Sequence, residues 1–251
     1  MRTTVDILGV PVDNVTMNEA LDIVENLLNG DRSHSVFTPN AEIMMAAQRD
    51  SHFKKILRSA DLVVPDGAGV VLASKILKPV LKDRVAGFDL TCNLFKKFSN
   101  KDARFFFLGG KPGVAKEAHQ KLLDKNININ VVGIRDGYFS ESEEDKIINQ
   151  INSSKADILL VALGAPKQEK WIYKHLKQID ARVCIGVGGT FDGIAGKMKR
   201  APKFFQNHGL EWLYRLFKDP KRFFRMLDIP KFIFLVVAKK IKLCIQSIYK
   251  N

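Results

Sequence analysis

The fold of this chain is decided by one stretch, residues 158–171, which reads ILLVALGAPKQEKW. Its first part, Ile158–Leu163, is an unbroken apolar run, which is typical of a parallel strand that is buried on both faces. Gly164 and Pro166 then mark a turn, and the amphipathic pattern predicts a helix over Lys167–Leu176. A strand, a turn and a helix in this order form the repeating unit of parallel α/β sheets.

The same unit recurs along most of the chain. Several of the amphipathic stretches open with helix start signals, such as Thr16 followed by Glu19 and Ser140 followed by Glu143. Further strands are expected at Val5–Leu8, Ser35–Thr38, Leu62–Val64, Arg104–Leu108, Asn130–Ile134 and Val183–Val187. Further helices are expected at Met17–Leu28, Ala41–Asp50, Gly69–Leu77, Gly87–Ser99, Pro112–Asp124 and Glu141–Ser153. The pattern predicts an α/β fold with a mostly parallel sheet flanked by helices.

The last fifth of the chain differs from the rest in charge. From Lys197 onward it carries 14 Lys and Arg against 3 Asp and Glu, which is +11 of the chain's net +13. This basic segment also contains aromatic and aliphatic runs, of which Phe232–Val237 is one. Because cations and apolar side chains are combined there, the segment indicates a protein that works at an anionic surface.

Prolines divide this basic segment. Because proline is tolerated at a helix start but not inside a helix, Pro202, Pro220 and Pro230 predict helices of about 10–17 residues. We therefore expect an α/β core over residues 1–195. A short, basic, amphipathic helical appendage is expected over residues 196–251.

Composition narrows the class of protein. A chain of 251 residues with 46% hydrophobic residues buries a sizeable core and is not disordered. Its three cysteines, Cys92, Cys184 and Cys244, are widely spaced, which favours a reducing compartment over a disulfide framework. No run reaches the roughly 18–20 apolar residues of a membrane span. Asp6 and Asp13 interrupt the N-terminal apolar residues, so no signal peptide is expected.

Two of the loops that follow expected strands carry short polar side chains. Ligands of open parallel sheets bind beyond the carboxyl ends of the strands, where these loops lie. Thr38 and Asn40 could hydrogen-bond a hydroxylated ligand, or they could cap the following helix. Asp66, which lies between Pro65 and Gly67, could act as a general base or could serve as a turn or capping residue. The local sequence leaves both alternatives open.

Two further loops have features of binding sites. Gly109 and Gly110 separate a strand from a helix, an arrangement that directs backbone N–H groups at a diphosphate. Gln168 lies in the first turn of its helix and could bind a sugar or a base edge. No two aspartates stand two residues apart and the histidines have no metal-ligand spacing, so the sequence does not require a metal.

These loops, taken together and in order, resemble the WecG/TagA/CpsF family of glycosyltransferases (glycosyltransferase family 26). The resemblance covers nearly the whole chain and is specific, because separate motifs agree in content and order. The residues that carry it are Thr38–Asn40, Pro65–Gly67, Arg84–Asp89, Phe107–Gly110, Leu163–Glu169, Gly186–Asp192, Arg200–Pro202 and Gly209–Leu216. It implies a Rossmann-like sheet and transfer of a sugar from a UDP-sugar to a sugar on a polyprenyl-diphosphate carrier. It implies no cofactor.

The resemblance also implies a reaction and a set of site residues. The reaction is inverting transfer of N-acetylmannosamine (ManNAc) from UDP-ManNAc to O4 of undecaprenyl-diphosphate-linked GlcNAc, a step in building the wall teichoic acid linkage unit. ManNAc uronic acid or glucose as the donor sugar remains open. Asp66 is the implied base, and the implied substrate-binding residues are Thr38, Asn40, Arg84, Gln168, Arg215, Arg222 and Arg225. For the last three, simple attraction to anionic lipid is the alternative.

The resemblance implies a peripheral protein on the cytoplasmic face of the membrane that self-associates through its core. Two other classes fit less well. A nucleic-acid-binding protein would interleave its basic residues with exposed aromatic residues on a groove, whereas here the charge is confined to the tail. A NAD-dependent enzyme would carry the dinucleotide fingerprint, which the Gly109 loop lacks.

Overall fold

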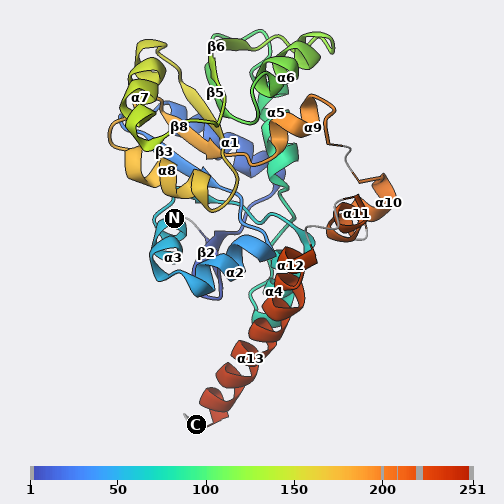
Figure 1. Cartoon of the computed structure of the whole chain (residues 1–251). Helices are drawn as coiled ribbons and strands as arrows, with labels where there is room; N and C mark the ends of the chain where they lie inside the picture. Colours follow the sequence, from blue (N-terminus) through green and yellow to red (C-terminus); the bar gives the residue numbers. More distant parts are fainter. Residues whose placement is uncertain (1–2, 199–200, 208, 219–222, 249–251) are drawn as a thin grey trace.

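The computed structural model describes residues 3–198, 201–207, 209–218 and 223–248. Its main sheet has six strands in the order β4-β3-β8-β7-β5-β6, and every neighbouring pair is parallel (Figure 1). The strands are β3 (His34–Phe37), β4 (Leu62–Val63), β5 (Arg104–Gly109), β6 (Asn130–Arg135), β7 (Ile158–Ala162) and β8 (Val183–Gly186). The predicted α/β fold with a parallel sheet is confirmed.

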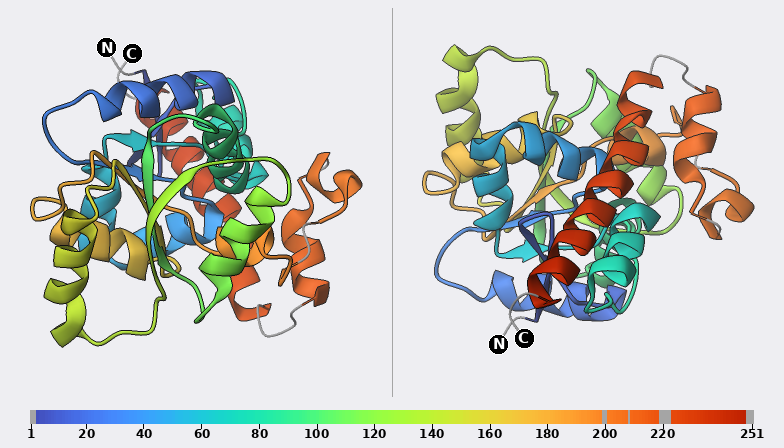
Figure 2. Two further views of the ribbon diagram at one scale, coloured as in Figure 1. Left: turned by 90° about the horizontal axis from the view of Figure 1, so that it is seen from above. Right: turned by 90° about the horizontal axis from the view of Figure 1, so that it is seen from below.

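Helices cover both faces of this sheet, as the two views of Figure 2 show. Because successive side chains of a strand point to opposite faces, Phe105 and Phe107 join one hydrophobic cluster whereas Phe106 and Leu108 join the other. The first cluster includes residues of α1 (Met17–Leu28), α5 (Gly87–Lys97), α6 (Val114–Leu123) and α9 (Thr190–Ile194). The second includes residues of α2 (Ala41–Arg49), α3 (Ser51–Arg58), α4 (Ala68–Leu77), α7 (Glu144–Ser153) and α8 (Lys167–His175).

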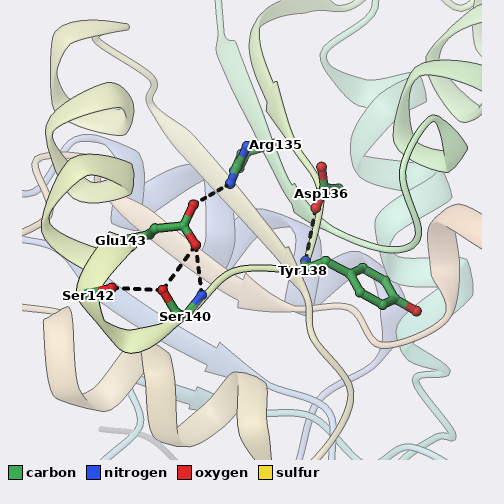
Figure 3. A network of polar contacts seen from close by, with 6 residues as sticks. All are labelled: Arg135, Asp136, Tyr138, Ser140, Ser142 and Glu143. Carbon is green, nitrogen blue, oxygen red and sulfur yellow. Dashed lines mark hydrogen bonds and ion pairs between the residues drawn. The ribbon is translucent and has the colours of Figure 1, made fainter.

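The two predicted helix start signals are confirmed as capping boxes. The backbone N–H of Glu19 donates to Thr16 Oγ1 over 3.3 Å, and the N–H of Thr16 donates to Glu19 Oε2 over 2.7 Å. In the 3₁₀ turn η1 (Glu141–Glu143), which precedes α7, the N–H of Ser140 donates to Glu143 Oε2 over 2.9 Å. Glu143 also pairs with Arg135 at the end of β6 (Figure 3). The polar residues of this loop therefore hold the loop itself together.

A small hairpin precedes the main sheet, and only its first half was predicted. Strand β1 (Thr4–Ile7) pairs antiparallel with β2 (Val10–Asp13) through a turn in which Leu8 and Gly9 both have positive φ. Pro11 lies within β2, where proline is tolerated because both strands of a two-stranded hairpin are edge strands. Asp13 at its end accepts a hydrogen bond from the backbone N–H of Val63 over 2.7 Å. The hairpin is thereby tied to β4.

One expected helix is confirmed, and the helix that follows it was not predicted. The helix expected over Ala41–Asp50 is α2, which ends at Arg49, and Asp50 then begins α3. Asp50 Oδ1 accepts a hydrogen bond from the N–H of Phe53 over 2.9 Å, which caps α3. A single capping residue therefore separates α2 from α3.

The C-terminal segment forms the predicted helical appendage, but the predicted helix lengths are wrong. Its helices are α10 (Lys203–Asn207), α11 (Glu211–Lys218), α12 (Phe223–Met226) and α13 (Asp228–Ile248). Pro202 directly precedes α10, whereas Pro220 lies outside the described residues. Pro230 lies in the first turn of the 21-residue α13, where backbone N–H groups have no partner within the helix, as predicted for a proline at a helix start.

Helix α13 lies along α2 and α4 and extends past them toward the C-terminus (Figure 1). Phe232 and Val236 are fully buried in the same cluster as α2 and α4. Arg49 of α2 makes two hydrogen bonds, of 2.7 and 2.8 Å, to the carboxylate of Asp228. On the other side of the helix Phe234 is 72% exposed. Among the described residues, no helix is both long enough and apolar enough to span a membrane.

Candidate functional site

Polar loops follow the carboxyl ends of four neighbouring strands, β4, β3, β8 and β7. Thr38 and Asn40 follow β3, Asp66 follows β4, Gln168 follows β7, and the loop from Val187 to Asp192 follows β8. All of them line a single polar cavity of about 450 Å³. This volume lies within the range of about 300–1,000 Å³ that is typical of small-molecule sites. The cavity therefore brings together four of the predicted site residues, Thr38, Asn40, Asp66 and Gln168.

Asn40 both caps a helix and lines the cavity. Its Oδ1 accepts a hydrogen bond from the backbone N–H of Ile43 over 3.1 Å, which caps α2 as the sequence alternative proposed. Its side chain nevertheless lines the cavity. The amide nitrogen has two N–H groups that the cap does not use, since the cap engages the oxygen alone.

The side chain of Gln168 is buried at the cavity wall and is held by two hydrogen bonds. It is only 3% exposed. The backbone N–H of Gly188 donates to its Oε1 over 2.9 Å, and its Nε2 donates to Glu169 Oε1 over 2.9 Å. Gln168 thus links the loop after β7 to the loop after β8, and both loops line the cavity.

Asp66 lies in a turn that also positions Arg84. The backbone N–H of Asp66 donates to the carbonyl of Val64 over 3.0 Å, and the N–H of Val85 donates to the carbonyl of Pro65 over 3.0 Å. The second bond draws the segment before α5 against the Asp66 turn. Arg84 thereby comes to line a cavity that Asp66 also lines.

That second cavity is apolar and has a volume of about 420 Å³. It lies between the start of α4 and the helices of the appendage. Its apolar wall is formed by side chains of α4, α11, α12 and α13: Leu72, Trp212, Met226, Ile229 and Ile233. The two cavities share Asn40, Asp66 and Glu211 in their linings. Asp66 therefore stands where a polar cavity meets an apolar one.

Glu211 of α11 reaches this junction from the appendage. Its Oε2 lies 3.7 Å from Arg84 Nη1, and each of the two side chains is 22% exposed. An ion pair of this length and exposure adds little to stability. Its effect is to bring a carboxylate and a guanidinium together beside Asp66, at the seam between the core and the appendage.

The two glycines at the end of β5, Gly109 and Gly110, do not line either cavity. A side chain at Gly109 would place its Cβ 2.4 Å from the carbonyl oxygen of Ala162, so glycine is needed for the close approach of β5 to β7. Gly110 has positive φ and its N–H donates to the same carbonyl over 3.0 Å. These contacts give both glycines a structural role, and diphosphate binding by them stays a prediction.

The three tail arginines fall largely outside what the structure describes. Arg215 lies in α11 and Arg225 lies in α12, but both side chains are outside the described part of the chain. Arg222 lies outside the described residues altogether. Their contacts with a diphosphate or with lipid stay predictions.

Some cavity-lining residues lie in the motifs that carry the resemblance but were not predicted as site residues. Thr190 and Asp192 line the polar cavity, and Glu211 and Trp212 line the apolar one. The Gly188-Gly189 pair after a predicted strand was a usable signal for the first two, whereas the contribution of α11 depends on tertiary packing. Within the described residues, no group of three or more His, Cys, Asp or Glu side chains is arranged to hold a metal ion.

Comparison with known proteins places this site in a family. The model of the "Glycosyl transferase WecG/TagA/CpsF family" matches residues 5–244. A relative from Bacillus spizizenii is 38% identical over 84% of this chain and 81% of its own length. Relatives from Bacillus subtilis and Staphylococcus aureus are each 34% identical, over 94% and 95% of this chain and 92% and 94% of their own lengths.

All three relatives bear the name N-acetylglucosaminyldiphosphoundecaprenol N-acetyl-beta-D-mannosaminyltransferase. The family model extends from the first strand into α13, and so covers both cavities and the appendage helices that line the second one. The likeness therefore includes the whole site. This chain belongs to the WecG/TagA/CpsF family of glycosyltransferases.

Proposed function

We propose that this enzyme transfers ManNAc from UDP-ManNAc to O4 of undecaprenyl-diphosphate-linked GlcNAc, with inversion, as in the synthesis of the wall teichoic acid linkage unit. The names of the relatives support this donor sugar and this acceptor. The observation that carries the proposal is the position of Asp66, whose side chain lines both a polar and an apolar cavity. A lipid-linked acceptor and a sugar nucleotide need two such cavities that meet at the reacting atoms.

The chemistry requires one base. The Asp66 carboxylate takes the proton from the 4-hydroxyl of the acceptor GlcNAc, and that oxygen attacks C1 of ManNAc from the face opposite the leaving group. The bond from C1 to the diphosphate oxygen breaks, and UDP leaves with the electron pair. Because the reaction is a single displacement, the configuration at C1 of ManNAc is inverted. The base must therefore lie on the face of ManNAc from which the acceptor hydroxyl attacks.

The two cavities suit the two substrates. Thr38, Asn40 and Gln168 supply polar groups for the UDP-sugar in the polar cavity. The apolar lining of the second cavity supports its use by the first isoprene units of the acceptor, and Arg84, which also lines it, is proposed to bind the acceptor diphosphate. Arg215, Arg222 and Arg225 are proposed to supply the remaining positive charge for the leaving UDP.

We also propose that the appendage holds the enzyme on the inner face of the cytoplasmic membrane. The net +11 charge from Lys197 onward and exposed aromatic side chains such as Phe224, which is 80% exposed, favour an anionic lipid surface. In this proposal residues 1–195 form the core and residues 196–251 form the appendage. Self-association through the core is a further proposal, which sedimentation analysis would test.

Substitution of the proposed base tests the mechanism. Asp66→Asn keeps the size of the side chain and removes the proton acceptor, so transfer to a short-chain lipid-diphosphate-GlcNAc should fall by at least about a hundredfold. Asp102→Asn is the matched control, since Asp102 is exposed before β5 at the opposite edge of the sheet. Near-normal turnover by a folded Asp66→Asn variant would remove Asp66 as the base.

A further inference from the structure

A buried carboxyl group is hydrogen-bonded to a residue that lines the polar cavity. Glu169, in the first turn of α8, is 1% exposed. Its Oε1 accepts the hydrogen bond from Gln168 Nε2, whereas its Oε2 is buried without a hydrogen-bond partner among the described residues. Such an unpartnered buried oxygen costs free energy, and burial raises the pKa of Glu169 to about 7. Packing alone does not explain a carboxyl group here, because methionine would fill a similar volume without that cost.

The contacts of Gln168 show what this carboxyl group does. A glutamine amide has one acceptor oxygen and two N–H donors. The oxygen of Gln168 is taken by the N–H of Gly188, and one N–H is taken by Glu169. A half-turn of the amide would set its NH₂ against the N–H of Gly188 and its oxygen against Glu169 Oε1. The two partners therefore select one orientation of the amide.

The backbone around the amide leaves it little room to move. A Cβ atom at Gly186, at the end of β8, would lie 2.8 Å from Gln168 Nε2. The amide is thus packed against the strand, with Gly188 on one side and Glu169 on the other. The second N–H of Nε2 is used by neither of these contacts, and Gln168 lines the polar cavity.

We propose that Glu169 is a positioning residue: it fixes the amide of Gln168 so that the remaining N–H of Nε2 is offered to an oxygen of the sugar nucleotide in the polar cavity. The identity of that ligand rests on the proposed function. The positioning itself rests on the contacts of Gln168 alone. Glu169 touches no substrate in this arrangement and acts through Gln168.

The competing explanation is structural. An acidic residue in the first turn of a helix is favoured by the helix dipole, and Glu169 could serve only that purpose. Under that explanation its loss would change stability but not the amide of Gln168. The two explanations therefore differ in two expected results. They differ in whether loss of Glu169 changes hydrogen exchange at the Gly188 amide, and in whether its effect on Km requires Gln168.

Four variants separate the two explanations. Glu169→Met removes the acceptor, Glu169→Gln keeps an acceptor oxygen in the same place, and Gln168→Ala removes the amide. The fourth variant combines Glu169→Met with Gln168→Ala. Hydrogen exchange at the Gly188 amide should become several-fold faster in Glu169→Met than in wild type, and Glu169→Gln should restore most of the protection. The Km for UDP-ManNAc should rise about tenfold in Glu169→Met, since a hydrogen bond is lost at the donor.

The combined variant gives the decisive comparison. If Glu169 acts through Gln168, Glu169→Met adds nothing further to the Km of Gln168→Ala. Unchanged exchange at Gly188 in Glu169→Met, or a Km effect of full size in the Gln168→Ala background, would overturn the proposal. If the wild-type protein fails to use UDP-ManNAc, the proposed function fails, and the exchange at Gly188 still decides the role of Glu169.

Discussion

The buried carboxyl group of Glu169 makes a quantitative prediction about stability and pH. Burial raises its pKa from 4.5 to about 7 in the folded protein. Between these two values the unfolded chain releases this proton while the folded chain keeps it. The free energy of unfolding must therefore decrease as the pH rises through this window, and the decrease levels off above the folded pKa. The pKa difference corresponds to about 3 kcal/mol, at about 1.4 kcal/mol for each pKa unit.

Glu169→Gln removes this titration while keeping the shape of the side chain. Chemical denaturation of both proteins from pH 5 to pH 8 should show wild type losing about 2–3 kcal/mol more than the variant, because other titrating groups are common to both. Glu141→Gln, at an exposed glutamate before α7, is the matched control and should follow wild type. Parallel pH curves for wild type and Glu169→Gln would refute the reasoning.

Other predictions concern the appendage and its contact with the core. Phe232→Ala should cost about 3–5 kcal/mol in chemical denaturation because Phe232 is fully buried, and a cost below 1 kcal/mol would contradict the packing of α13. Phe234→Ala should change stability by less than about 0.5 kcal/mol but weaken binding to anionic vesicles, and unchanged vesicle binding would argue against this face as the membrane contact. Asp228→Asn should lower the free energy of unfolding by about 1–2 kcal/mol, because it breaks the bidentate pair with half-exposed Arg49. An unchanged free energy of unfolding would show that α13 is held without that pair. Glu211→Gln should lower the rate of transfer several-fold while changing the free energy of unfolding by less than about 1 kcal/mol, and full activity would exclude a role for its charge.

The order of strands and helices was predictable because buried parallel strands leave unbroken apolar runs and capping residues mark helix starts. The run beginning at Ile158 and the capping boxes at Thr16 and Ser140 gave correct elements for these reasons. The second strand of the hairpin and helix α3 were missed, because a proline inside a short apolar run argues against a strand and a helix that directly follows another has no turn signal before it. Both exceptions depend on tertiary context.

The candidate site was predictable only in part. Thr38, Asn40, Asp66 and Gln168 follow β3, β4 and β7, which lie within four consecutive strands of the sheet, so the rule for carboxyl ends brings them together. Gly109 is the last residue of β5, which lies on the far side of β7 from β8, and the absence of a side chain there allows close packing against β7. Glu211 reaches the site because α11 docks beside the segment that carries its partner, a contact that no local pattern encodes.

The most direct test of the account is to identify the product. The full-length protein would be incubated with a short-chain lipid-diphosphate-GlcNAc and, separately, with UDP-ManNAc, UDP-ManNAc uronic acid and UDP-glucose, and the linkage of any product would be determined by NMR. The account predicts one product, from UDP-ManNAc, with ManNAc attached in inverted configuration to O4 of GlcNAc. Transfer from another UDP-sugar only, retention of configuration, or attachment at a different hydroxyl would contradict it.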